Sequence, residues 1–140
     1  MNLPLYTAAL GAFLIVLQVV LMVAVGSRRV KGPALGTGGD KDMERRVRRH
    51  GNLAENSGLF LAVLVILELL AGQSTYVLSL CILFAVARFS HAIAFSSLAG
   101  SHGEDLTGAR KLFGGARFIG ALGTLLTALG AAGGLVANLV

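Results

Sequence analysis

The chain has 140 residues, of which 55% are hydrophobic and 14% are charged, and its formal net charge is +5. Long apolar runs exclude a soluble domain, because four of them each supply the roughly 20 residues that span a hydrocarbon core of about 30 Å. The single cysteine, Cys81, excludes a disulfide framework, and the three histidines are not expected to converge on a metal. We therefore predict an all-α integral membrane protein, a single bundle of four transmembrane helices over residues 1–140.

The first predicted helix, residues 3–27, is apolar apart from Gln18, which we expect to bond to a neighbouring helix. It lacks the basic start of a signal peptide and is too long for one, so we expect it to be retained. The following stretch contains Gly-Pro and Gly-Gly pairs, which indicate a loop. Asp40 or Asp42 is expected to cap the next helix.

The second predicted helix, residues 42–72, begins with charged residues and continues into an apolar run. At 100° per residue, Arg45, Arg48, Asn52 and Glu55 fall within an arc of roughly 80°. Such a stripe entering a membrane must face protein or trapped water. It predicts a binding site for a small, highly charged molecule.

Glu68 lies about 20 Å further along this helix than the polar stripe. We expect its side chain to reach the outer interface, with a proton or cation site as the alternative.

The third predicted helix, residues 76–100, carries Arg88 and His91 on one face. An arginine inside a span needs a partner, and Glu55 is the expected one, which would bring these residues and Asn52 into one pocket. The alternative is an ion pair that only locks the bundle. His102, in the third connection, is expected to be solvated.

The fourth predicted helix, residues 110–139, is rich in small residues that permit close helix packing. Two rows recur at intervals of four: Ala116, Gly120, Thr124 and Ala128, and Gly123, Thr127 and Ala131. Arg117 lies where this helix enters the membrane, level with the polar stripe, although it could simply extend to the interface.

Most of the 12 lysines and arginines lie between Arg28 and Arg49, and three more flank the start of the fourth helix. The positive-inside rule then places the first and third connections in the cytoplasm and both termini outside. Nucleic-acid binding is disfavoured, because these charges flank membrane spans and no aromatic platform accompanies them.

The motif Glu44-Arg45-x-x-Arg48-x-His50-x-Asn52-x-x-Glu55 resembles the helix 2 signature of the MAPEG family, the membrane-associated proteins in eicosanoid and glutathione metabolism. Arg88-x-x-His91-Ala92 and Arg117-x-x-Gly120-x-x-x-Thr124 are similar to its later elements, especially in small bacterial members. The resemblance covers essentially the whole chain. It implies a homotrimer in a bacterial inner membrane, with glutathione held between subunits on the cytoplasmic side and lipophilic electrophiles conjugated or reduced.

By resemblance, Arg117 would lie near the glutathione thiol, or Arg110 would take that role. The residues that would bind glutathione are Arg45, Arg48, Asn52, Glu55, Arg88 and His91. The chemistry agrees, since arginine forks suit carboxylates, an acid suits an ammonium, and a nearby cation lowers a thiol pKa from about 8.5. Phe95 stands where family members often carry a tyrosine, and Asn56 where an aromatic is common.

Two other functions compete with a glutathione transferase or peroxidase. A non-catalytic lipid-binding or scaffold protein of the same fold would fit the missing tyrosine hydroxyl at Phe95. A small four-helix transporter would need an acid in the middle of a span, and Glu68 lies off the polar stripe.

Overall fold

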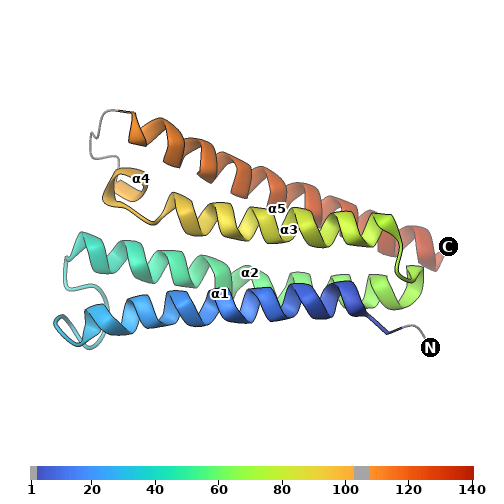
Figure 1. The fold of residues 1–140 in the computed structure, drawn as a ribbon, viewed down its shortest axis with the longest axis horizontal. Coiled ribbons are helices and arrows are strands. Elements are labelled where there is room, and N and C mark those ends of the chain that lie inside the picture. The colour runs from blue at the N-terminus through green and yellow to red at the C-terminus, as the bar shows by residue number, and fades with distance from the viewer. Residues whose placement is uncertain (1–2, 103–107) are drawn as a thin grey trace.

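The computed structural model describes residues 3–102 and 108–140, and these are helical apart from short connections. Its long helices lie side by side along the long axis (Figure 1), and a single-turn helix lies at one end. The elements are α1 Leu5–Arg29, α2 Lys41–Ala71, α3 Thr75–Ala94, α4 Leu98–His102 and α5 Ala109–Leu139. The prediction of four long apolar helices is confirmed. Both termini lie at one end, and α4 lies at the other with the α1–α2 connection, here called the loop end.

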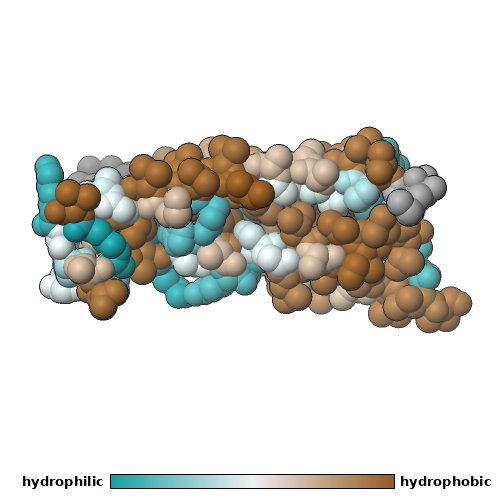
Figure 2. Space-filling model, turned by 90° about the horizontal axis from the view of Figure 1, so that it is seen from below, coloured by the Kyte–Doolittle hydropathy of each residue, from teal (hydrophilic) through white to brown (hydrophobic). Residues whose placement is uncertain are grey.

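The long helices α1, α2, α3 and α5 are each long and apolar enough to cross a membrane. Large apolar side chains are exposed on all of them, for example Ile15, Leu59, Ile82 and Leu129. Figure 2 shows hydrophilic residues at the loop end and along the middle of this face, whereas the surface toward the other end is mostly hydrophobic. Such a surface suits lipid rather than water, and the protein is an integral membrane protein.

Helices α3 and α5 approach closely because α5 presents small residues to α3. A Cβ atom on Gly123 would lie 2.9 Å from the Ala87 Cβ, and one on Gly130 would lie 2.6 Å from the Leu80 Cδ2. Thr127 and Ala131 are buried along the same face. The predicted packing role of the row that begins at Gly123 is therefore confirmed.

Asp40 caps the start of α2, as the sequence predicts. Its Oδ1 accepts hydrogen bonds from the backbone N–H of Asp42 and of Met43, at 2.9 and 3.3 Å. Its Oδ2 accepts from the Arg28 Nη2 at 2.7 Å. The carboxylate thereby satisfies free N–H groups of the first turn and ties the end of α1 to the start of α2.

We expect the Asp40→Asn variant to lower thermal stability at neutral pH and to match the wild type in strong acid. The hydrogen bond from Arg28 holds the pKa of Asp40 below its ordinary value of 3.8. A carboxyl group whose pKa is lower in the folded than in the unfolded protein stabilises the fold at pH values above the unfolded-state pKa. This stabilisation is lost as the pH falls through the folded-state pKa. Thermal unfolding in detergent across pH measures this, and a difference that does not change with pH would contradict it.

Helix α3 ends at Ala94, whereas the sequence predicts a helix to residue 100. Phe95 leaves the helix with φ −101° and ψ 18°, and the serine pair that follows starts α4. The Ser97 Oγ accepts from the Gly100 N–H at 3.3 Å, as an N-cap residue does. His102 consequently belongs to a helix and is half-buried, so the expectation of a solvated loop histidine is wrong.

Glu68 does not reach the outer interface, so that expectation is also wrong. Its side chain is 1% exposed and binds the start of α1. Its oxygens accept from the Tyr6 N–H at 2.9 Å, the Thr7 N–H at 2.8 Å and the Thr7 hydroxyl at 2.6 Å. Glu68 is therefore the N-terminal cap of α1, supplied by a different helix.

Candidate functional site

The polar stripe of α2 is divided between the interior and the surface. Arg45 is buried and Asn52 half-buried, whereas Arg48 and Glu55 are exposed. Helix geometry explains the division, because Arg48 and Glu55 lie about 60° and 80° around the helix from Arg45, and Asn52 only about 20°. Arg48 and Glu55 therefore lie on the same exposed face of α2, two helical turns apart.

Arg45 ties the start of α2 to the end of α3. Its Nη1 donates to the Phe95 carbonyl at 2.9 Å. Its Nε donates to the Asp42 Oδ1 at 3.1 Å, and its Nη2 contacts the same oxygen. Each of its three nitrogens therefore already has a protein partner.

A cavity of about 190 Å³ lies at the loop end. Its lining residues are Glu44, Arg45, Arg48, Phe95, Ser101, His102 and Arg117. Three guanidinium groups against one carboxylate favour an anionic ligand. We call this space the cationic cavity.

Arg88 lies deeper in the bundle and is 2% exposed. It donates to the Asn52 Oδ1 at 3.2 Å and contacts the Thr124 hydroxyl, and its guanidinium carbon lies 5.3 Å from the Phe84 ring centroid. The predicted ion pair with Glu55 is therefore wrong. Within the described residues its Nε has no hydrogen-bond partner.

His91 is half-buried between α5 and the end of α3. A Cβ atom on Gly120 would lie 2.6 Å from the His91 Cδ2, so the ring packs directly on that glycine. Its centroid lies 6.4 Å from that of Phe95. His91 thus contacts a residue of the cationic cavity without lining the cavity itself.

The structure brings together Arg45, Arg48 and Arg117 but spreads the other predicted site residues around them. Asn52 and Arg88 form the deeper cluster, and Glu55 lies on the exposed face of α2. The side chain of Arg110 lies outside the described part of the structure. Ser101 and His102 line the cavity without having been predicted, and the signal that could have found them is the serine pair that starts α4.

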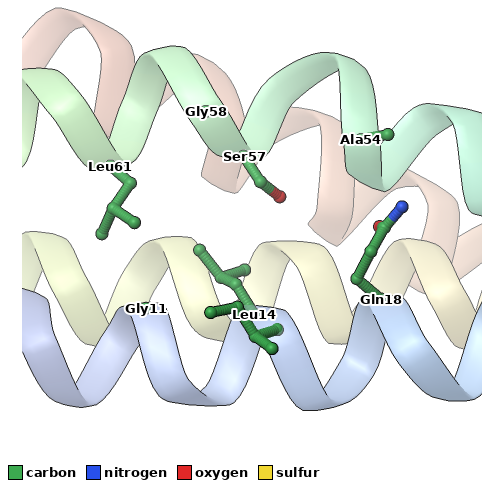
Figure 3. Close-up of a pocket in the computed structure, with 8 residues that line it drawn as sticks. Gly11, Leu14, Gln18, Ala54, Ser57, Gly58 and Leu61 are labelled. Carbon is green, nitrogen blue, oxygen red and sulfur yellow. The ribbon is translucent and has the colours of Figure 1, made fainter.

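A second cavity, of about 270 Å³, lies between α1 and α2 (Figure 3). Apolar side chains and glycines dominate it, and the side chains of Gln18 and Ser57 point into the space between the helices. The Gln18 Nε2 lies 2.7 Å from the His50 Nε2, which confirms the predicted bond between helices. This groove shares no lining residue with the cationic cavity.

A sequence model of the MAPEG family matches residues 3–137, nearly the whole chain. This chain belongs to the MAPEG family. Neither the curated proteins nor the solved structures include a significant match to it. MAPEG proteins include glutathione transferases and peroxidases, so a thiol tripeptide is the ligand against which the cavity must be tested.

The cationic cavity is too small to enclose a tripeptide by itself. About 190 Å³ is below the roughly 300–1,000 Å³ of sites that enclose a drug-sized ligand. A tripeptide in this MAPEG protein would place one part in the cavity and extend along the exposed face of α2. That face presents Arg48 and Glu55, a cation and an acid, to the rest of the ligand.

Proposed function

We propose that this MAPEG protein is a glutathione-dependent membrane transferase or peroxidase that acts on lipophilic electrophiles. The observation that carries the proposal is the cationic cavity, with Arg48 and Arg117 from two helices on its wall. Arg48 in the cavity wall lies on the exposed face of α2 that also carries Glu55.

Each charged group of glutathione has a complementary group in this region. Arg48 suits a carboxylate, because a guanidinium donates two parallel hydrogen bonds to both oxygens. Glu55 suits the ammonium group. The Asn52 Oδ1 is occupied by Arg88 at 3.2 Å, so Asn52 offers its amide N–H groups to a carbonyl or carboxylate of the ligand.

Arg117 provides the positive charge for the reactive end of the ligand. A cation close to the sulfur favours the thiolate, which is the nucleophile. The thiolate sulfur then forms a bond to the electrophilic carbon, the leaving group departs with its electron pair, and the thiol proton passes to solvent. Lipophilic electrophiles reach the site sideways from the bilayer.

A homotrimer would complete the site. The face that carries Arg48 and Glu55 is uncovered in a single chain, and a second copy packed there would enclose the part of glutathione that the cavity cannot hold. The basic loop end is the cytoplasmic side in this proposal, with both termini outside and the protein in a bacterial inner membrane.

A second candidate function is lipid binding without catalysis. Phe95 lies in the wall of the cationic cavity and has no hydroxyl to donate to a thiolate. The apolar groove between α1 and α2 also offers about 270 Å³ to an acyl chain. Such a protein would bind lipid and show no turnover with glutathione.

We expect the detergent-purified protein to bind glutathione in the micromolar to millimolar range, and Arg48→Ala and Glu55→Ala each to weaken that binding roughly 10- to 100-fold. Each variant leaves one charge of the ligand without a partner, which costs about 1.5–3 kcal/mol or roughly 10- to 100-fold in affinity. Titration calorimetry measures this.

Lys31→Ala is the matched control, because it removes one exposed positive charge near the same end and lies outside the cavity. We expect it to bind as the wild type does. Turnover of a chlorodinitrobenzene then separates the transferase from the lipid-binding candidate. A folded, homogeneous wild-type protein that binds no glutathione would refute the proposed function.

A further inference from the structure

The guanidinium of Arg117 lies over one aromatic ring, that of Phe95. The side chain of Arg117 is exposed on α5, and its guanidinium carbon lies 4.6 Å from the centroid of Phe95. Among the residues that the structure describes, Arg117 has no recorded hydrogen bond or ion pair, and the Phe95 ring is the one recorded attractive contact of its guanidinium. A long side chain loses rotamer freedom when it is fixed, so without the ring this one would swing away from the cavity.

The residue Phe95 has contacts on both its backbone and its ring. Its backbone carbonyl accepts the hydrogen bond from Arg45 at the end of α3, where a cation compensates the free carbonyls of a helix. Its ring stacks near His91, with an angle of 19° between the planes. The side chain is buried at 6% exposure, so its position is fixed by the fold and not by the ligand.

We propose that Phe95 is a positioning residue that holds Arg117 at the cationic cavity, and that Arg45 fixes Phe95 through its carbonyl. The proposal rests on the proposed function, in which Arg117 stabilises the glutathione thiolate. In this proposal Arg45 affects the thiolate indirectly, because it bonds to Phe95 and Phe95 in turn positions Arg117. Arg45 therefore does not need to contact glutathione. A guanidinium lying over a ring keeps its N–H edges free for a thiolate, so it is the ring of Phe95 that matters and not the hydroxyl it lacks.

The test compares Phe95→Leu, which removes the ring, with Phe95→Tyr, which keeps it. One readout is the rate at which an arginine-specific dicarbonyl reagent modifies Arg117 without glutathione, followed by peptide mass spectrometry. The other is the thiolate fraction of bound glutathione, from its ultraviolet absorbance against pH. Phe118→Leu is the matched control, because Phe118 follows Arg117 but is 66% exposed and does not line the cavity.

We expect Phe95→Leu to speed the labelling of Arg117 and to lower the thiolate fraction roughly three- to tenfold, with little change in glutathione affinity. Phe118→Leu should match the wild type in both readouts. Phe95→Tyr should match it in the labelling of Arg117 and keep a thiolate fraction at least as high, because it retains the ring and adds a hydroxyl that can donate to the thiolate. In an Arg117→Ala background, Phe95→Leu should no longer change the thiolate fraction, because its effect passes through Arg117.

Unchanged labelling of Arg117 in Phe95→Leu would overturn the proposal, as would a loss of thiolate that persists in the Arg117→Ala background. A wild-type protein that binds no glutathione would instead refute the proposed function. Labelling would still decide the positioning in that case, and faster modification of Arg117 in Phe95→Leu would support it.

Discussion

Replacing Glu68 by alanine is expected to destabilise the protein by about 3 kcal/mol or more. The variant removes the acceptor of three hydrogen bonds, from two backbone N–H groups and one hydroxyl at the start of α1. Thr7 is 1% exposed, so water cannot replace the lost acceptor. Each buried donor left unsatisfied costs about 1–3 kcal/mol.

Glu55→Ala is the matched control, because Glu55 is an exposed acid on the same helix with no hydrogen bond recorded to the described residues. Its effect on stability should stay within about 0.5 kcal/mol. Helix content during denaturation in mixed micelles measures both variants. Equal losses of stability would contradict the capping role, and Glu68→Gln, which keeps one carbonyl oxygen, should fall between them.

The sequence was sufficient to predict the four helices and the family, but not to predict which residues bind the buried charged side chains. Apolar runs of spanning length predict helices directly, and the motif around Arg48 and Asn52 resembles MAPEG proteins. Helix periodicity also placed the polar stripe correctly within one arc.

Partners depend on small angular differences and on helix register, which periodicity does not give. Arg48 and Asn52 lie only about 40° apart around α2, yet one is exposed and the other bonds to Arg88. Glu68 likewise caps α1 because the two helices pair antiparallel in one particular register. The sequence shows neither of these relations.

The end of α3 was mispredicted for a different reason, which is local competition for hydrogen bonds. Apolar residues continue beyond Ala94, so hydropathy alone extends the helix to residue 100. Serine side chains bond to nearby backbone groups, and Ser97 does so with the Gly100 N–H. The resulting turn moves Phe95 and His102 to the wall of the cationic cavity.

Replacing Gly123 by leucine is expected to destabilise the protein by about 1–3 kcal/mol and to weaken glutathione binding. A Cβ atom there would lie 2.9 Å from the Ala87 Cβ, which is fixed to the backbone of α3 and cannot rotate away. The two helices must therefore separate, a strain typical of overpacked interiors. The adjacent Thr124 would then move away from Arg88, its partner across the same interface.

Gly133→Leu is the control on the same helix, because a Cβ atom at Gly133 meets nothing within 4 Å. Leucine has a higher helix propensity than glycine, by somewhat less than about 1 kcal/mol, so this variant should be as stable as the wild type or more so. Thermal unfolding and titration with glutathione, run in parallel on both variants, distinguish the effect of close helix packing from the effect of helix propensity. If Gly123→Leu were as stable as Gly133→Leu, the close contact of α3 and α5 would not be what holds Arg88 against Thr124. If Gly123→Leu instead lost glutathione binding but kept its helix content, the distance between α3 and α5 would be shown to affect the binding site. Arg88 links the two, because it contacts Thr124 on α5 and donates a hydrogen bond to Asn52.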